Sequence, residues 1–181
     1  MLKSIRKTTL ALLVFLVMSA CSTEDANMPP TYIQPVEIGL PAPDFLFKDM
    51  QGAAFRLSEN RDKVVLIFFW RLKCEECTQQ MDSLEALHKQ YKDTGLEVVA
   101  VSAESIYSAS LYNLTEFLKA RALTFRVLRD EQGFVSEAFQ VIKAPAAYII
   151  GKDGVLRAIK QGPQDWQSEE NLALIQGLLN G

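Results

Sequence analysis

The run VVLIFFW at residues 64–70 is the feature that most restricts how this chain can fold. Seven consecutive apolar residues, rich in β-branched and aromatic types, are typical of a strand covered on both faces. A second buried-type run, LEVVAVS, follows at residues 96–102. Strands of this kind need other elements packed above and below them, so we expect the two runs to form the centre of a covered sheet.

Shorter patterns around these runs alternate between strand and helix. A helix is expected from about residue 74 to 92, because apolar side chains there recur on one side at the helical period. The other predicted elements are a hairpin of residues 44–49 and 53–59, an amphipathic helical insertion at about 113–121, a short strand at 124–128, a short helix at 131–139, a hairpin of 146–150 and 155–160, and a closing helix at 168–179. This order predicts one α/β domain over residues 41–181, with a central mixed sheet flanked by helices.

The first 20 residues differ in composition from the rest of the chain. Three basic residues precede the apolar run LALLVFLVMSA, which is too short to span a bilayer as a helix and is typical of a secretory signal. The segment VMSAC at 17–21 resembles the bacterial lipobox, although Met18 stands where leucine is usual. We predict a lipoprotein signal peptide at residues 1–20 and lipidation of Cys21. The alternative is ordinary cleavage after Ala20, which leaves Cys21 a free thiol.

Residues 21–40 are polar and carry proline without sustained periodicity, so we expect a lipid-anchored flexible tether. Removing the signal peptide takes away three of the 19 basic residues and none of the 22 acidic ones, which changes the net charge from −3 to −6. A mildly acidic chain without a basic block gives no electrostatic basis for binding nucleic acid. We expect the protein in the bacterial cell envelope, facing the periplasm or the cell exterior, and leave open which membrane holds it.

Two cysteines, Cys74 and Cys77, follow the first apolar run closely in the sequence FWRLKCEECTQQM. A structural zinc site needs four ligands, and the chain has one further cysteine, Cys21, and one histidine, His88. Covalent haem attachment needs histidine after the second cysteine, where Thr78 stands, and an iron–sulfur cluster needs more cysteines. The pattern therefore favours neither a metal site nor a bound cofactor.

The pair is then either a passive staple or a redox couple. A staple across so short a loop removes little entropy from the unfolded chain. The redox interpretation places Cys74 at a helix N-terminus, where backbone N–H groups and the helix dipole stabilise a thiolate. Cys77 lies one turn further on the apolar stripe and is expected to be shielded. One exposed attacking thiol and one sheltered resolving thiol suit disulfide exchange.

The predicted domain resembles the TlpA/ResA-type branch of the thioredoxin-like proteins, which are membrane-tethered thiol–disulfide oxidoreductases. The resemblance rests on PAPDFLFKDMQGAAFRLSENRDKVVLIFFW, on the CxxC motif behind it, and on VLRDEQGFVSEAFQVIKAPAAYIIGKDGVL in the second half. It implies a thioredoxin-like fold with Cys74 as nucleophile and Cys77 as resolving cysteine. It also implies a cis peptide bond at Pro145, with the Ala144 backbone offering hydrogen bonds to an extended peptide. Trp70 either marks the active site, as in the family, or is an aromatic residue at a strand end.

The sequence departs from the family's pattern around the cysteines. Glu76 stands where many relatives have proline, and Lys73 where an aromatic residue is common. Gln80 stands where some relatives have a glutamate that is a candidate proton shuttle, and glutamine cannot titrate. Phe68 stands where thioredoxin has a buried aspartate, and His88 lies about 21 Å along the helix from the first cysteine, too far to substitute. The proton shuttle therefore stays unidentified, and His88 is interpreted as a core-edge residue.

Glu75 and Glu76, between the cysteines, have opposing effects. In the first turn of a helix each stabilises by about 0.3–1 kcal/mol. Both also disfavour a thiolate at Cys74, whereas Lys73 and Arg71 favour it. Because a less stabilised thiolate gives a more reducing couple, we predict an electron donor and not a strong oxidant.

The predicted function is an extracytoplasmic thiol–disulfide oxidoreductase that reduces disulfides in exported proteins without a cofactor. Its expected partners are a disulfide-bearing exported protein, an upstream membrane thiol donor and, through the lipid anchor, the membrane; the resemblance adds cytochrome c maturation as a role. Two alternatives share the fold. A peroxiredoxin-like thiol peroxidase needs a threonine-flanked cysteine and an arginine partner, and a copper-handling or adapter lipoprotein usually has a wider cysteine spacing and a distant histidine.

Overall fold

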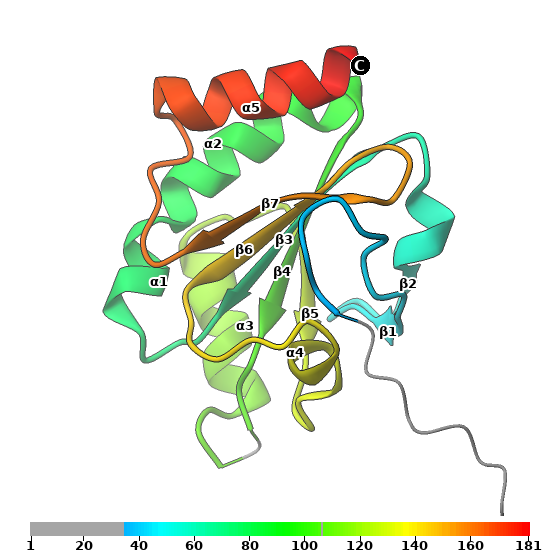
Figure 1. The fold of residues 1–181 in the computed structure, drawn as a ribbon. Coiled ribbons are helices and arrows are strands. Elements are labelled where there is room, and N and C mark those ends of the chain that lie inside the picture. The colour runs from blue at the N-terminus through cyan, green and yellow to red at the C-terminus, as the bar shows by residue number, and fades with distance from the viewer. Residues whose placement is uncertain (1–34, 106) are drawn as a thin grey trace, which may run out of the picture. The chain divides into compact units, whose positions relative to one another are not determined.

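A five-stranded mixed sheet forms the centre of the domain (Figure 1). The structure is a computed structural model and describes residues 35–105 and 107–181. The strand order is β5-β4-β3-β6-β7, with β3, β4 and β5 parallel and with β6 and β7 antiparallel to their neighbours. The elements are β1 (Leu46–Lys48), β2 (Ala54–Arg56), η1 (Leu57–Asn60), β3 (Val64–Trp70), α1 (Glu75–Gln79), α2 (Met81–Tyr91), η2 (Lys92–Thr94), β4 (Leu96–Ser102), α3 (Leu111–Ala120), β5 (Arg126–Arg129), α4 (Phe134–Ala138), β6 (Ala146–Ile150), β7 (Leu156–Gln161) and α5 (Glu169–Asn180).

The two apolar runs of the sequence form adjacent strands of this sheet. β3 lies in the middle, and all seven of its residues are buried. It pairs in parallel with β4 along its whole length and antiparallel with β6. Both predicted hairpins, the helical insertion and the closing helix are present, with ends shifted by a few residues. The predicted α/β fold with a covered mixed sheet is therefore confirmed.

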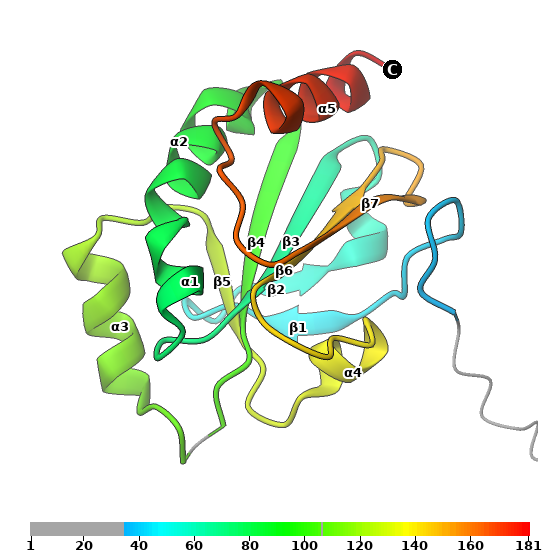
Figure 2. The ribbon, with the colours of Figure 1, turned by 60° about the vertical axis from the view of Figure 1, so that its left-hand side comes forward.

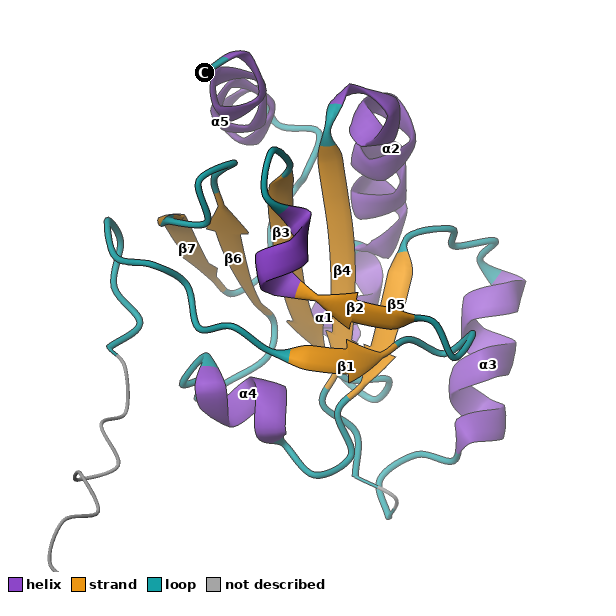
Figure 3. Cartoon of the chain, turned by 90° about the vertical axis from the view of Figure 1, so that its right-hand side faces the viewer, coloured by secondary structure: helices purple, strands orange, loops and turns teal. Residues whose placement is uncertain are grey.

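Different layers cover the two faces of the sheet (Figure 2). On one face, which we call the helical face, α2, α3 and α5 pack on Leu66 and Phe68 of β3. On the other, which we call the aromatic face, the β1–β2 hairpin and α4 pack on Ile67 and Phe69 (Figure 3). Successive side chains of a strand point to opposite faces, so one continuous apolar strand serves both cores.

The Asp49 carboxylate helps to fix the β1–β2 hairpin to the sheet. Asp49 accepts backbone hydrogen bonds from Gln51 at 3.0 Å and from Ala53 at 2.8 Å, which shapes the turn between the two strands. Its other oxygen pairs with the guanidinium of Arg126 in β5. The hairpin is thus held against the sheet edge that β5 forms.

The helix predicted from residue 74 to 92 is divided into two, and this part of the prediction was wrong. α1 and α2 meet at Gln80, whose ψ of −2° departs from that of a regular helix. The Gln80 amide nitrogen donates to the Glu76 carbonyl at 2.9 Å, and its oxygen accepts from the Trp166 indole N–H at 3.1 Å. Trp166 is remote in the sequence, so helical periodicity carries no sign of this contact.

The N-terminal part of the described chain is tied to the turn between β6 and β7. The Gly39 N–H donates to the Leu156 carbonyl at 2.8 Å, and the Leu156 N–H donates back to Leu40 at 2.9 Å. The Ala42 N–H donates to Gly154 at 3.0 Å. These bonds begin two residues before the predicted domain boundary at residue 41.

The predictions about membrane attachment concern residues that lie largely outside the described range. The signal peptide at 1–20, the lipidation site Cys21 and the tether as far as residue 34 lie outside the described residues. Among the residues that are described, no helix has the length and apolar character needed to cross a bilayer.

Candidate active site

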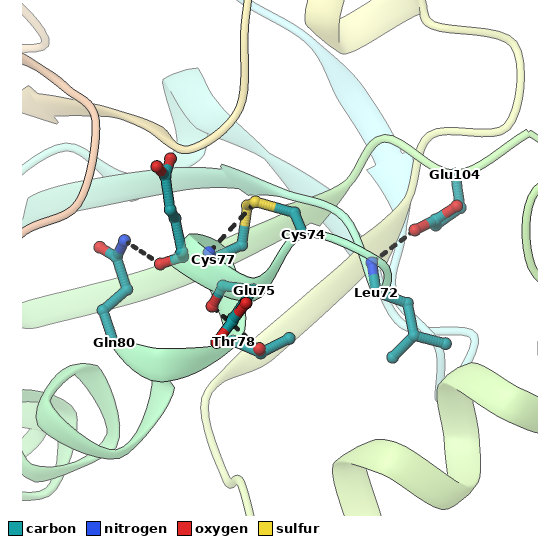
Figure 4. Close-up of a disulfide and its surroundings, with 8 residues drawn as sticks. Leu72, Cys74, Glu75, Cys77, Thr78, Gln80 and Glu104 are labelled. Carbon is teal, nitrogen blue, oxygen red and sulfur yellow. Dashed lines mark hydrogen bonds between the residues drawn. A yellow bond between two sulfur atoms is a disulfide. The ribbon is translucent and has the colours of Figure 1, made fainter.

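Cys74 and Cys77 form a disulfide where the chain passes from β3 into α1 (Figure 4). Their Cα atoms are 5.2 Å apart. Cys74 has an extended backbone and is the N-cap of α1, so its side chain stands at the start of the helix. Its Sγ accepts a hydrogen bond from the Cys77 N–H at 3.1 Å. A donor in this position also favours a thiolate at Cys74 once the disulfide is reduced.

The two sulfur-bearing residues differ in access. Cys77 has no exposed surface and belongs to the core of the helical face, together with Met81. Cys74 is only partly buried. Cys74 is therefore the more accessible of the two sulfur-bearing residues.

The loop before β6 forms the opposite wall of the site. The peptide bond between Ala144 and Pro145 is cis, as the family resemblance implies. Ala144 and Cys74 both line a surface groove of about 410 Å³. The Pro145 carbonyl accepts from the Gly162 N–H at 2.9 Å, which ties this loop to the end of β7. An extended peptide in the groove would lie beside Cys74 and the Ala144 backbone.

Glu104 also lines the groove and was not singled out by sequence reasoning. Its side chain is buried, with 2% exposed, and accepts from the Leu72 N–H (Figure 4). It also accepts from the Ser108 hydroxyl. It thereby holds the segment that leads into Cys74. One signal was present in the sequence: Leu72 and Glu104 each follow a predicted strand by two residues. The structure shows that these strands are parallel, so that their carboxyl ends meet at one sheet edge.

Trp70 and Phe68 lie beneath the site and do not line the groove. Trp70 is fully buried, and its ring packs at 5.5 Å from that of Phe117. Within the described chain its indole nitrogen has no hydrogen-bond partner. Phe68 is 1% exposed in the same core. Trp70 thus supports the layer that holds Cys77, as an aromatic residue at the end of a strand.

The charged residues next to the cysteines are exposed, whereas Gln80 is buried. Lys73, Glu75 and Glu76 face solvent. The Glu75 carboxylate accepts from the side chain of Gln79 at 3.0 Å. Gln80 has 4% exposed surface and is held between α1 and Trp166. Its amide is a structural link and offers no titrating group.

His88 lies in α2 at the edge of the helical core. Its ring meets Phe125 edge-on at 6.3 Å. Burial lowers the pKa of the imidazole, while the nearby carboxylates of Glu85 and Glu97 act in the opposite direction. This environment agrees with the interpretation of His88 as a core-edge residue.

The chemistry available at the site is two-electron exchange between a dithiol and a disulfide. Across residues 35–105 and 107–181, no three histidine, cysteine or acidic side chains gather as metal ligands would. The groove instead brings together Cys74, the cis-proline loop and several charged side chains.

Comparisons with known proteins point to the same chemistry. The sequence profile described as the AhpC/TSA family matches residues 38–159. A thiol-disulfide oxidoreductase ResA from Bacillus cereus is 33% identical over 141 residues, which cover 77% of this chain and 79% of that protein. A ResA from Bacillus thuringiensis is 29% identical and covers 94% of this chain and 98% of its own.

A solved structure agrees with both. It is described as a thiol:disulfide interchange protein DsbE from Chlorobium tepidum, is 26% identical, and superimposes with a TM-score of 0.72 over 80% of this chain and 99% of its own. The resemblance predicted from the sequence, and with it the thioredoxin-like fold, is confirmed.

Proposed function

The chain is a thiol–disulfide oxidoreductase of the AhpC/TSA family, and from that premise we propose that it reduces disulfides in exported proteins. The observation that carries the proposal is the unequal access to the two cysteines. Cys74 borders a groove beside the cis-proline loop, and Cys77 is buried in the core. Such a pair attacks a partner through one sulfur and resolves the intermediate with the other.

The proposed reaction begins with both cysteines reduced. The Cys74 thiolate attacks one sulfur of the substrate disulfide, a new S–S bond forms, and the other substrate sulfur leaves as a thiolate. Cys77 then gives its proton to solvent and attacks the Cys74 Sγ. The second substrate sulfur leaves as a thiolate and takes up a proton, and the Cys74–Cys77 disulfide seen in the structure remains. Two electrons pass to the substrate, and an upstream membrane thiol donor restores the dithiol.

Opposing charges lie around Cys74. Glu75 and Glu76 are exposed on the first turn of α1 and disfavour a thiolate, whereas Lys73 and Arg71 favour it. The proposed role as an electron donor requires the two carboxylates to dominate, because a less stabilised thiolate makes the couple more reducing. Equilibration with a thiol–disulfide buffer of known potential measures this directly. We expect an electron donor, and a reduction potential above about −150 mV would contradict it.

The proposed location is the cell envelope, with the chain anchored through a lipid on Cys21. The support is the lipobox-like VMSAC segment after a basic and apolar leader. Fractionation of cells producing the Cys21→Ser variant should show the protein leaving the membrane fraction. The Cys74→Ser variant is the control and should stay with the membrane.

A trapping experiment tests the function most directly. In the Cys77→Ser variant the resolving step is lost, so a mixed disulfide between Cys74 and the partner should accumulate in envelope extracts. A Cys74→Ser variant should form none. Absence of any thiol-sensitive adduct with Cys77→Ser would contradict the proposed exchange.

The same protein preparation distinguishes the reductase from a thiol peroxidase. We expect the reduced protein to cleave insulin disulfides faster than it consumes peroxide. Identification of the trapped partner by mass spectrometry then tests whether the substrates are cytochrome c precursors, as the role in cytochrome c maturation implied by the family resemblance would require.

A further inference from the structure

The groove beside the disulfide is bordered by an unusual set of cations. Arg71 and Lys73 reach it from the segment after β3, and Lys143 reaches it from the loop before the cis-proline. We call this surface, defined by these three residues with Cys74 and Ala144, the basic groove. Two loops remote in the sequence thus contribute like charges to the place where a substrate must enter.

These three cations are exposed and have no ion-pair partner in the described part of the chain. Most other basic residues there are paired with carboxylates, as Arg126 is with Asp49. Like charges that line one groove repel one another, and none of the ion pairs found in the described residues involves these three side chains. An anionic partner would remove the repulsion.

The carboxylate that lines the groove does not meet this need. Glu104 is buried, and its oxygens are engaged by the Leu72 N–H and the Ser108 hydroxyl. It lowers the net charge of the lining without pairing with any of the three cations. The exposed rim therefore remains positive in a protein whose overall charge is negative.

The other side of the disulfide carries the opposite charge. Glu75 and Glu76 are exposed on α1 and do not line the groove. An acidic segment lying along α1 would be repelled, whereas one lying in the basic groove would be attracted. The charge difference across Cys74 therefore favours acidic residues on one side only of an incoming cysteine.

We propose that the basic groove selects substrate proteins in which acidic residues flank the target cysteine on one side. The inference rests on the proposed function and names the substrate class for the same site. Ile142, whose side chain is fully exposed at the edge of the groove, adds an apolar contact beside the charges. A peptide fits these observations better than a lipid headgroup, because the cations share the groove with the reactive Cys74.

The test uses the reduced full chain in detergent and synthetic peptides with one cysteine blocked as a mixed disulfide with a chromogenic thiol. One peptide has acidic residues before the cysteine, one has them after it, and two matched peptides carry lysine instead. Attack by Cys74 on the peptide sulfur releases the chromogenic thiolate, whose absorbance gives a second-order rate constant. At low salt we expect one acidic peptide to react about tenfold faster than its lysine counterpart, and the preference to shrink as salt is added.

Charge reversal assigns the preference to the groove. The double variant Lys73→Glu with Lys143→Glu should lose or invert it. The matched control, Lys48→Glu with Lys92→Glu, changes two exposed and unpaired lysines elsewhere and should keep it. Because each comparison is a ratio of two peptides with one leaving group, a change in Cys74 reactivity caused by Lys73→Glu cancels.

The outcomes separate the inference from the function. Equal rates for all peptides, or a preference unchanged in the groove variant, would overturn the inference and leave the oxidoreductase intact. A groove variant that binds phosphatidylglycerol vesicles more weakly than the wild type but keeps its peptide preference would show that the three cations bind lipid headgroups. That result would overturn the inference as well. No release of the chromogenic thiolate from any peptide would overturn the proposed function together with the inference.

Discussion

The helical face and the aromatic face cover the same sheet in different ways. On the aromatic face, the rings of Phe45, Phe55, Phe69, Phe139 and Tyr148 meet at centroid distances of 5.1–5.9 Å. Polar side chains also join separate segments on both faces. Asp49 pairs with Arg126 on the aromatic face, where Arg126 lies over the Phe55 ring, and the helical face has hydrogen bonds of this kind around the helices that follow the disulfide. These join Gln80 to Trp166, Glu85 to Thr124, and Tyr91 to Gln176.

This difference predicts that the aromatic face contributes to stability alone, whereas the helical face also affects the redox chemistry of the disulfide. Burial of apolar surface has little directional preference, whereas hydrogen bonds fix distance and angle. Cys77 lies in the core of the helical face, and α1 is fastened there through Gln80. We therefore expect substitutions on the aromatic face to change stability alone. Substitutions at the polar contacts around the disulfide should also change the properties of Cys74.

The largest expected effect comes from a ring of the aromatic face. Phe55 is 2% exposed, packs on Phe45 and lies under the guanidinium of Arg126. The Phe55→Ala variant should lose about 3–5 kcal/mol of unfolding free energy, measured by urea denaturation of the oxidised protein. Phe55→Leu should lose less. A shift of the reduction potential in either folded variant would contradict the prediction that the aromatic face affects stability alone.

Glu104→Gln should have the next largest effect. The amide keeps one acceptor oxygen, but it cannot accept from both Leu72 and Ser108, so about 1.5–3 kcal/mol of unfolding free energy is lost. Because Leu72 leads into Cys74, the rate of alkylation of Cys74 in the reduced protein should change too. Ser108→Ala leaves the Leu72 contact in place and serves as the control. Equal alkylation rates in Glu104→Gln and the wild type would contradict a positioning role.

A smaller loss is expected where Trp166 meets Gln80. Trp166→Phe removes the donor and leaves a buried amide oxygen unpaired, which costs about 1–2 kcal/mol. Adding Gln80→Leu removes the unpaired group and should restore part of the stability in a double-mutant cycle. The reduction potential should move in Trp166→Phe, since Gln80 follows Cys77 by one helical turn. If the effects of Trp166→Phe and Gln80→Leu on stability were additive and the reduction potential were unchanged, this expectation would be contradicted.

Local patterns were sufficient for the elements and for the position of the cysteines. The seven apolar residues of β3 and the CxxC behind it placed Cys74 at a helix start, because strand burial and helix capping act over a few residues. The contacts made by Gln80 and Glu104 could not be predicted from such local patterns. The break at Gln80 coincides with its bond to Trp166, and the role of Glu104 depends on the register of β3 against β4. Contacts between remote segments leave no periodic trace in the sequence.

The smallest expected effect is a pH dependence of the unfolding free energy, which we assign to His88 on the helical face. Burial lowers the folded-state pKa of His88, so the unfolded chain takes up its proton at a higher pH. The contribution of neutral His88 to the unfolding free energy is then fully present above the unfolded-state pKa of about 6.5. It is lost as the pH falls through the folded-state pKa. His88→Gln should flatten the decline in unfolding free energy between about pH 7.5 and about pH 5.5.

The aromatic face supplies the control for this measurement. Burial raises the pKa of Tyr148, so its hydroxyl stays neutral throughout that range. Tyr148→Phe should therefore leave the slope of stability against pH unchanged. An equal slope in the wild type and His88→Gln would contradict the assignment, since the chain has a single histidine.

The bonds from Gly39, Leu40 and Ala42 to the β6–β7 turn determine which end of the domain a tether would hold. That turn follows Ile150, which pairs near the start of β3, whereas Cys74 follows the end of β3. Seven residues of strand, about 23 Å, separate the two ends. A restraint applied through the segment of residues 39–42 would therefore act at one pole of the domain and leave the basic groove free at the other.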